Sequence, residues 1–288
     1  MRYFRTRVDG STHLVVDADD DWYDLTAAKS RVTGFRDLLT VSDVAGTDPD
    51  DLARRLIDRA AQIDAPTEDG LARPLVPDEV WGAGVTYQIS EEAREAESGM
   101  AEVYLQVYEA DRPEIFFKAT PNRIVGPGDA IGIRADSDWN VPEPELGIVL
   151  FDGDVVGFTL GNDVSSRDIE GTNPLYLPQA KIYENSCSIG PSVRSADSVA
   201  DPHDLRLAMR IERDGDVLYE EETDTGEMVR EVEELVSYYT RHNHVPELAV
   251  LLTGTSLVPP DDFTLETTDT VEMDLESVGT LRNDVIEV

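Results

Sequence analysis

The stretch EPELGIVLFDGDVVGFTLGND, residues 143–163, carries the clearest structural signal in this chain. Two runs rich in branched and aromatic residues, 146–151 and 155–160, flank the turn-forming sequence Asp152-Gly153-Asp154. Such runs on either side of a short turn that contains glycine are typical of an antiparallel β-hairpin. We therefore predict a hairpin over residues 143–163.

Three carboxylates lie at the open end of this hairpin. Glu143 and Glu145 are two residues apart, so on a strand their side chains point to one face. A three-residue loop centred on Gly153 sets Glu143 opposite Asp163. Close carboxylates repel one another, and protonation or a bound cation relieves the repulsion. Because all the ligands are oxygens, the preferred ion is Mg²⁺, followed by Mn²⁺ or Ca²⁺.

Two alternatives stay open for these carboxylates. A two-residue loop would shift the pairing by one residue and turn Asp163 to the other face of the hairpin. The hairpin would also be an ordinary solvated one if its acids arose by chance, since the chain contains 60 Asp and Glu residues.

Acidic residues dominate the whole chain. They outnumber the 24 Lys and Arg residues and give a formal net charge of −36. Such a surface repels phosphate backbones and anionic lipids, which argues against nucleic-acid and membrane partners. Only three cations are lysines: Lys29, Lys118 and Lys181. Acid excess with so few lysines is typical of a salt-saturated cytoplasm, and we expect folding to depend on salt.

The chain carries no sign of export. Cys187 is its single cysteine and has no partner for an intramolecular disulfide, so we expect it to be a buried packing residue. The start, MRYFRTRVDG, lacks the apolar segment of a signal peptide, and no apolar run is long enough to span a bilayer. We expect a soluble, cytoplasmic protein.

The elements outside the hairpin predict an α+β fold. Residues 1–75 form a small N-terminal α+β domain, with a hairpin around Asp9-Gly10 and an amphipathic helix over 48–63. A polar stretch that ends at Pro74 and Pro77 marks a soft boundary.

Residues 76–288 form a second, β-rich domain of rolled or sandwiched sheets. Its two predicted helices cover 91–109 and 228–241, where apolar residues recur at helical spacing. Its further predicted strands are 115–119, 205–212, 248–253 and 270–275.

Lys118 and Lys181 are candidates for chemistry because they remain in a chain that has nearly lost lysine. Such positions are expected where arginine cannot replace a compact amine with an adjustable pKa. Lys118 alternates with Glu114 and Phe116, so the three share one face of a strand. The alternative is a pair of ordinary ion-pairing lysines.

In order along the chain, several segments resemble the fumarylacetoacetate hydrolase family. They span about residues 79 to 288 and are Gly84-Val-Thr-Tyr87, Phe116-Phe-Lys118, Gly126-Pro-Gly-Asp129, Glu143-Pro-Glu145, Gly161-Asn-Asp-Val-Ser-Ser-Arg-Asp168, Lys181, Thr253-Gly-Thr255 and Gly279-Thr-Leu-Arg-Asn283. The resemblance implies a small N-terminal domain followed by a fumarylacetoacetate hydrolase-type catalytic roll, assembled as a homodimer or homotetramer.

The resemblance also implies roles for single residues. Glu143, Glu145 and Asp163 match the ligands of a divalent metal, and Lys181 matches the active-site lysine beside it. Thr255 lies in the loop that helps close the substrate site. Separately, the neighbours Arg167 and Asp168 are expected to form an ion pair with each other behind the site.

One segment departs from the hydrolytic members of the family. These carry Gly-x-Asn-Tyr-x-x-His, whose histidine helps to activate water, whereas this chain has Ser90 at that position. Together with residues 112–118, this resembles the branch that dehydrates 2-keto-3-deoxy sugar acids. The implied activity is the Mg²⁺-dependent conversion of a 2-keto-3-deoxypentonate to 2-oxoglutarate semialdehyde. Alternatives are an acylpyruvate-type hydrolase, a 2-oxo acid decarboxylase or isomerase, and a binding protein for 2-oxo acids.

For the dehydratase activity we predict the following roles. Lys181, with its pKa lowered by burial and the metal, removes a proton from C3. Glu114 stays protonated among phenylalanines and helps the C4 hydroxyl to leave, although the two roles are open to exchange. Lys118 is a candidate for binding the substrate carboxylate, and Ser90 or Thr255 for a hydrogen bond to a substrate hydroxyl.

Overall fold

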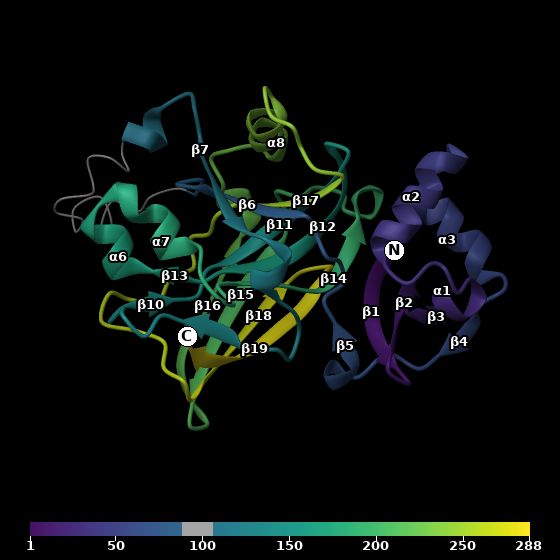
Figure 1. Cartoon of the computed structure of the whole chain (residues 1–288), viewed down its shortest axis with the longest axis horizontal. Helices are drawn as coiled ribbons and strands as arrows, with labels where there is room; N and C mark the ends of the chain where they lie inside the picture. The colour runs from purple at the N-terminus through teal and green to yellow at the C-terminus, as the bar shows by residue number, and fades with distance from the viewer. Residues whose placement is uncertain (88–105) are drawn as a thin grey trace.

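A long mixed sheet runs through the protein, whose computed structural model describes residues 1–87 and 106–288 (Figure 1). Its 12 strands are β1 Arg2–Val8, β2 Ser11–Ala18, β3 Asp21–Asp24, β4 Ala61–Ile63, β5 Leu71–Ala72, β6 Glu79–Gly84, β7 Glu114–Ala119, β8 Ile124–Val125, β11 Pro144–Phe151, β12 Asp154–Asp163, β14 Cys187–Ser195 and β17 Leu248–Leu252. The main path is β4-β3-β2-β1-β14-β12-β11-β17-β6-β7, while β5 pairs with β1 and β8 with β14. The β11–β12 hairpin lies near the middle of this path.

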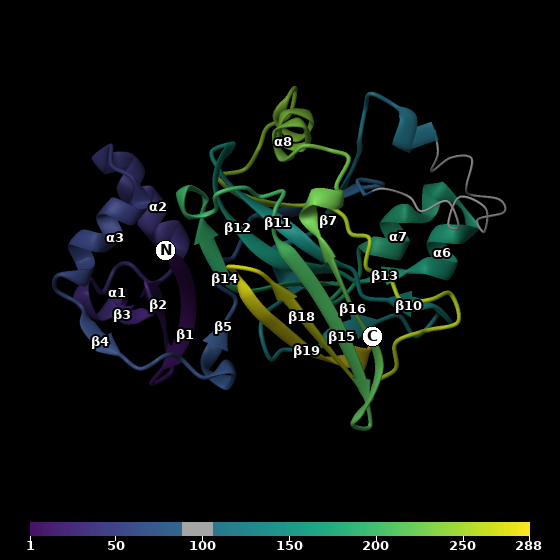
Figure 2. The same cartoon turned by 180° about the vertical axis from the view of Figure 1, so that it is seen from behind.

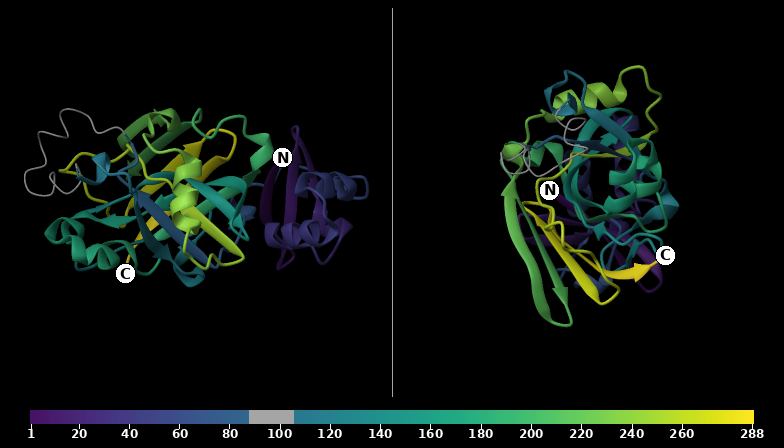
Figure 3. Two further views of the ribbon diagram at one scale, coloured as in Figure 1. Left: turned by 90° about the horizontal axis from the view of Figure 1, so that it is seen from above. Right: turned by 90° about the vertical axis from the view of Figure 1, so that its left-hand side faces the viewer.

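A second sheet packs against the first. Its five strands are β9 Ile131–Ile133, β15 Arg206–Arg213, β16 Asp216–Asp224, β18 Asp269–Leu275 and β19 Gly279–Glu287, in the order β16-β15-β18-β19-β9. Figures 2 and 3 show its green and yellow strands as a separate layer beside the β11–β12 hairpin. Apolar side chains of both layers, such as Leu146 and Ile148 from one and Leu207 and Met209 from the other, share one buried core. This agrees with the predicted β-rich, layered architecture.

Short helical elements and one short strand pair complete the described chain. The helices are α1 Leu25–Ala28, α2 Phe35–Ala45, α3 Pro49–Ile57, α6 Arg167–Thr172, α7 Leu177–Lys181 and α8 Val232–Thr240, and the 3-10 turns are η1 Glu68–Gly70, η2 Pro121–Arg123, η3 Pro174–Tyr176, η4 Ala196–Ser198 and η5 Thr225–Glu227. β10 Asn140–Val141 pairs with β13 Ser165–Ser166. None of the described helices is long and apolar enough to cross a membrane.

Two predicted helices are shorter than expected, and one lies mostly outside the described residues. The helix predicted over 48–63 ends at Ile57, because Ala61–Ile63 pair with β3 instead. The helix predicted over 228–241 begins only at Val232, because Met228 and Val229 bond to the backbone around Tyr87. Of the helix predicted over 91–109, the part up to residue 105 lies outside the described residues, and 106–109 are helical.

The N-terminal hairpin is confirmed and joins the main sheet. Asp9 and Gly10 both have positive φ, 48° and 79°, as a tight two-residue turn between twisted strands requires. β1 also pairs with β14, so hydrogen bonding continues from the N-terminal strands into the rest of the sheet. The division of the chain near residue 75 stays a prediction. All predicted strands in the second part of the chain are confirmed.

The central hairpin has a shorter loop than predicted. Only Asp152 and Gly153 form the turn, both with positive φ, and Phe151 pairs with Asp154. Without a further irregularity, this two-residue loop would turn Asp163 away from Glu143.

A β-bulge restores the predicted register farther along the same hairpin. Val149 pairs with Gly157 and Leu150 with Val155, so Val156 is an extra residue on β12. Beyond the bulge, Pro144 pairs with Asn162. The Asp163 amide donates a 2.9 Å hydrogen bond to the Glu143 carbonyl. The predicted loop is therefore wrong, but the predicted pairing of Glu143 with Asp163 is confirmed.

The excess of carboxylates should make stability depend on salt. With 60 acidic and 24 basic residues, most surface carboxylates have no cation to pair with, and only dissolved ions screen their repulsion. We expect the thermal midpoint to rise by at least about 10 °C between roughly 0.2 M and 2 M KCl, which corresponds to about 6 kcal/mol for a chain of this size. Circular dichroism melts would measure it, with NaCl as a control for general screening. A midpoint that does not change with salt would contradict the prediction.

Candidate active site

A cavity of about 500 Å³ opens at the end of the β11–β12 hairpin. β6, β7, β16, the helices α6 and α7 and the loop after β17 contribute to its lining. Among the residues singled out from the sequence, it is lined by Glu114, Glu143, Glu145, Asp163, Lys181 and Thr255. The sheet order thus brings together residues as far apart in the chain as Glu114 and Thr255, which are separated by 141 positions.

The three carboxylates of the hairpin form a buried cluster. Glu143, Glu145 and Asp163 are all buried, and one oxygen of each lies within 4.8 Å of the others. Burial rules out the alternative of an ordinary solvated hairpin. Buried carboxylates at this spacing need compensating positive charge, which cationic side chains or a bound metal can supply.

Cationic partners hold Glu143 in its charged form. Lys181 Nζ lies 2.6 Å from Glu143 Oε2, and an Arg167 guanidinium nitrogen lies 2.7 Å from Oε1. The Ser165 hydroxyl donates a 2.9 Å hydrogen bond to Oε2. Burial alone would raise the pKa of Glu143, but the charges of Lys181 and Arg167 outweigh it and lower the pKa to about 2.

Glu145 is in the opposite situation. Its carboxylate accepts a 2.7 Å hydrogen bond from the Gly254 amide, and no ion pair is found for it within the described part of the chain. Burial raises its pKa well above the usual value, and the charges of Asp163 and Glu143 raise it further. The charged form of Glu145 therefore lacks a compensating cation, which a bound metal ion would supply.

Lys181 lies at the centre of the cluster. Its Nζ contacts Glu143, Asp163 Oδ2 at 2.8 Å and Ser165 Oγ at 2.6 Å, and it lies 5.4 Å from the centre of the Phe116 ring. Burial alone would lower the pKa of Lys181, but the two carboxylates outweigh it and the pKa lies well above its usual value. The predicted lowering of this pKa includes the charge of a bound metal and stays a prediction, since without a metal both neighbouring acids stabilise the ammonium form.

Lys118 does not line the cavity but lies behind Asp163. Its side chain is 0% exposed, and Nζ lies 2.5 Å from Asp163 Oδ1. The same ammonium donates to the carbonyls of Val164, at 2.9 Å, and Lys181, at 2.6 Å. The ammonium is enclosed, has an ion-pair partner and two hydrogen-bond acceptors, and does not reach the cavity, so the predicted contact with the substrate carboxylate is wrong. Lys118 instead positions Asp163 and the backbone of Lys181.

Replacing Lys118 by methionine should destabilise the protein strongly. The change removes one of the two lysines that pair with Asp163 and one donor from each of the Val164 and Lys181 carbonyls, and removal of one partner of a buried ion pair costs about 3–5 kcal/mol. Urea unfolding in concentrated KCl would measure the loss. The exposed Lys29 provides a matched control, Lys29→Met, which should change stability by less than about 0.5 kcal/mol. A small effect for both variants would contradict the positioning role.

Glu114 is placed as predicted at the cavity wall. It begins β7 opposite Gly84, where a Cβ atom would come within 2.1 Å of a Glu114 carboxylate oxygen, so glycine leaves the space for this side chain. Burial raises the pKa of Glu114, although the nearby Lys181 ammonium partly offsets this. The direction agrees with the expectation that Glu114 can hold a proton.

Of the two residues predicted to form a hydrogen bond to a substrate hydroxyl, the structure describes one. Thr255 lines the cavity, and its Oγ1 accepts a 3.0 Å hydrogen bond from the Leu257 amide, which leaves its proton available for donation. Ser90 lies outside the described residues.

Two lining residues were not predicted from the sequence: Arg167 and Glu170. Arg167 pairs with Glu143 and lies 3.4 Å from Glu170. Asp168 instead accepts hydrogen bonds from the hydroxyls of Ser137 and Ser166. The predicted pair of Arg167 with Asp168 is therefore wrong. Residues three apart on a helix share a face, so the spacing of Arg167 and Glu170 was the available signal once α6 was known.

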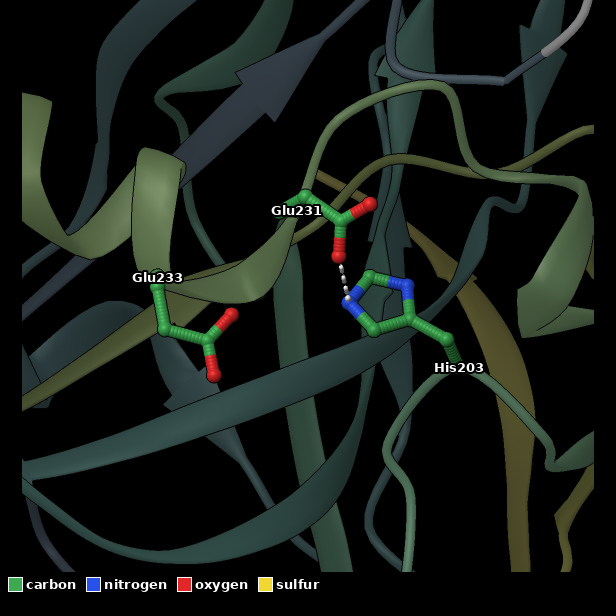
Figure 4. A group of neighbouring side chains, drawn as sticks. All are labelled: His203, Glu231 and Glu233. Carbon is green, nitrogen blue, oxygen red and sulfur yellow. Dashed lines mark ion pairs between the residues drawn. The ribbon is translucent and has the colours of Figure 1, made fainter.

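A second group of possible ligands lies outside this cavity, at the start of α8 (Figure 4). It consists of His203, Glu231 and Glu233, and the Glu231 carboxylate lies 3.4 Å from His203 Nε2. The same nitrogen accepts a 3.2 Å hydrogen bond from the Val232 amide, so its lone pair already has a partner at the end of the helix. The His203 ring thus caps the first backbone amide of α8.

Comparison with known proteins agrees with this geometry. Residues 79–286 match the family described as fumarylacetoacetate (FAA) hydrolase C-terminal. The chain is 56% identical, over the full length of both proteins, to a protein named probable 2-keto-3-deoxyxylonate dehydratase from Haloferax volcanii. It is 45% identical to the 2-dehydro-3-deoxy-D-arabinonate dehydratase of Saccharolobus solfataricus over 217 residues, 73% of this chain and 72% of that one.

A solved structure has the same fold over the whole chain. It is described as 2-keto-3-deoxy-D-arabinonate dehydratase complexed with magnesium and 2,5-dioxopentanoate. It superposes with a TM-score of 0.84 at 34% identity and covers 100% of this chain and 99% of that one. From the family match, the relatives and the buried carboxylate cluster, we conclude that the chain belongs to the fumarylacetoacetate hydrolase family.

Proposed function

We propose that the protein is a Mg²⁺-dependent hydro-lyase that converts a 2-keto-3-deoxypentonate, of the xylonate or arabinonate type, to 2,5-dioxopentanoate, also called 2-oxoglutarate semialdehyde. The observation that carries the proposal is the buried cluster of Glu143, Glu145 and Asp163 with Lys181 at its centre, inside the cavity. The two relatives named as dehydratases, and the solved structure with magnesium and 2,5-dioxopentanoate, support it.

The donor set of the cluster fits a hard divalent cation. Its three donors are carboxylate oxygens, which suit Mg²⁺ first and Mn²⁺ or Ca²⁺ next. The raised pKa of Glu145 shows that the charged form of this carboxyl is not stabilised by its neighbours, and a bound cation would stabilise it. Glu143, Glu145 and Asp163 would therefore hold the ion. When bound, it would supply positive charge that stabilises the negative charge developing on the C2 carbonyl oxygen of the substrate.

Lys181 is the base for the first proton transfer. Its ammonium form is stabilised by Glu143 and Asp163, and a cation that takes up their charge removes this stabilisation. The amine then removes a proton from C3, which the neighbouring C2 carbonyl makes acidic. Ser165 Oγ and the two carboxylates orient Nζ toward the cavity.

Glu114 is the acid for the leaving group. Its raised pKa allows it to give a proton to the C4 hydroxyl, so that the C4–O bond breaks and water leaves. Because the product carries its aldehyde at C5, one proton must then leave C5 and another must leave the C5 hydroxyl, while C3 regains a proton and C4 gains one. Arg167 is a cation at the cavity wall and is suited to the substrate carboxylate.

A hydrolase of the same family is the second candidate activity. Within the described residues, the cavity lining contains no histidine, whereas the water-activating residue of the hydrolytic members is a histidine. This observation favours the dehydratase over the acylpyruvate hydrolase. Decarboxylation, isomerisation and simple binding of a 2-oxo acid remain outcomes for the assay.

The deciding assay follows aldehyde formation from 2-keto-3-deoxypentonate with Mg²⁺ in concentrated KCl, using an aldehyde dehydrogenase as the coupling enzyme. Turnover that EDTA abolishes and Mg²⁺ restores is the expected result. Metal-loaded, folded protein that forms no aldehyde would reject the dehydratase. Acylpyruvates, tested in the same samples, would then identify a hydrolase, while Mg²⁺-dependent binding of pyruvate without turnover would identify a binding protein.

The proposal includes the setting of the enzyme. We place this activity in oxidative pentose breakdown in a salt-rich cytoplasm, carried out by a homodimer or homotetramer. Sedimentation equilibrium in concentrated KCl would measure the assembly, and a monomer at all concentrations would contradict that part of the proposal.

A further inference from the structure

The two sides of the cavity carry different chemistry. On one side, β7, α6 and α7 present the cations Lys181 and Arg167 together with the carboxyl groups of Glu114 and Glu170. The opposite side consists of Tyr87, the segment 221–227 and the loop after β17, and the described lining from these parts contains hydroxyls and carboxylates but no cation. An anionic group of a ligand is therefore attracted to the first side and repelled by the second.

The Tyr87 hydroxyl stands out on the second side. The residue is only 4% exposed and lines the cavity, and no hydrogen-bond partner for its hydroxyl is found among residues 1–87 and 106–288. Burial raises the pKa of Tyr87, and the nearby Glu145 carboxylate raises it further, so the phenol is neutral and can both donate and accept. Buried hydroxyls normally have a partner, and the missing partner of this one points to a ligand in the cavity.

The backbone holds Tyr87 firmly at this wall. The Thr86 hydroxyl donates to the Thr253 carbonyl, and the Thr86 carbonyl accepts a 2.7 Å hydrogen bond from the Val229 amide. Tyr87 itself forms a β-bridge with Met228. Val85, just before them, has a φ of 55°, which a β-branched residue adopts only where its surroundings impose it. The Tyr87 ring is thus presented to the cavity by a constrained segment.

We propose that the Tyr87 hydroxyl binds the terminal C5 hydroxyl of the substrate and selects sugar acids over 2-oxo acids that lack this group. The inference rests on the proposed function. The substrate has its carboxylate at C1 and a neutral hydroxyl at C5, and the carboxylate is repelled by the glutamates of the segment 221–227 and attracted to Arg167. The hydroxylated end therefore faces Tyr87. When the protein hydroxyl forms a hydrogen bond to a substrate hydroxyl, it discriminates against an analogue that lacks this group. With such an analogue bound, the buried Tyr87 hydroxyl is left without a partner.

The test compares two substrates and one conservative variant. 4-Hydroxy-2-oxopentanoate differs from 2-keto-3-deoxypentonate only by lacking the C5 oxygen, and loss of both compounds with Mg²⁺ present is followed by chromatography. The Tyr87→Phe enzyme should show a roughly tenfold rise in KM for the pentonate, with kcat and KM for the analogue within about twofold of the unmodified enzyme. Its thermal midpoint should not fall, because the removed hydroxyl has no partner in the part of the chain that the structure describes.

Tyr239→Phe is the matched control. The Tyr239 hydroxyl is also buried without a partner among the described residues, but Tyr239 lies beside Trp81 and does not line this cavity. This variant should keep the selectivity of the unmodified enzyme. Unchanged selectivity in Tyr87→Phe, or equal losses with both substrates, would overturn the inference while the dehydratase activity stands. An unmodified enzyme that turns over neither substrate would reject the proposed function, and the inference with it.

Discussion

Replacing Lys181 by methionine should lower kcat by about 1,000-fold or more, because the variant loses the amine that we propose as the base for C3. Methionine has a similar length and keeps the side chain packed near Phe116, but it cannot accept a proton. Mg²⁺ affinity should stay nearly unchanged, since the three carboxylates are retained. Single-turnover kinetics and calorimetric Mg²⁺ titration would separate the two effects.

The control for this variant is Lys29→Met, which makes the same change at an exposed site far from Lys181 in the chain. It should keep full activity. The Lys181→Met protein should be less stable without Mg²⁺, because Glu143 and Asp163 lose a buried cation, and Mg²⁺ should recover most of that loss. Activity retained by a folded, metal-loaded Lys181→Met enzyme would remove Lys181 from the mechanism.

Replacing Glu145 by glutamine should weaken Mg²⁺ binding by at least about 100-fold, because a metal ligand loses its charge while its shape is kept. Among the three carboxylates, Glu145 gives the cleanest test, because it is in none of the ion pairs found in the described structure. Turnover should fall in parallel and recover partly at high Mg²⁺. Calorimetry and the Mg²⁺ dependence of the rate would measure both.

The stability of the Glu145→Gln variant gives a second test, in which no loss is expected in the absence of Mg²⁺. Without Mg²⁺, Glu145→Gln should be as stable as the unmodified protein or more so, since it removes a buried acid that its neighbours hold near neutrality. With Mg²⁺ at about 100 times its dissociation constant, the unmodified protein should gain about 2.7 kcal/mol and the variant far less. Glu287→Gln, at an exposed position at the end of β19, is the control and should keep the full gain. A variant that keeps the Mg²⁺ stabilisation would show that Glu145 is no ligand.

Local patterns in the sequence predicted the strands well and the helix ends poorly. Alternation and turn residues are local properties, so strands such as Leu248–Leu252 and the Asp9-Gly10 hairpin are visible without any partner. The end of α3 at Ile57 is not, because the apolar spacing continues to Ile63 and only pairing with β3 ends the helix. Tertiary contacts override helical periodicity there.

The register of the central hairpin was predicted correctly, but the loop from which it was predicted was wrong. The three-residue loop was wrong, yet Glu143 still pairs with Asp163, because the extra residue at Val156 compensates for the shorter turn. A bulge has no strong signal in residue types, since Val, Ile and Phe suit paired and unpaired positions alike. Both errors shift the pairing by one residue, and they cancel.

Residue types and their order along the chain were sufficient to name the three carboxylates, Lys181 and Glu114, because those depend on face alternation and on an ordered set of motifs. The different positions of the two lysines are visible only in the folded structure. Lys118 is enclosed behind Asp163, while Lys181 reaches the cavity. The approach of Arg167 to Glu143 and the raised pKa of Lys181 likewise appear only when distant segments meet. Charge and burial act through space, so their balance at a buried site is set by the folded neighbourhood and not by position in the chain.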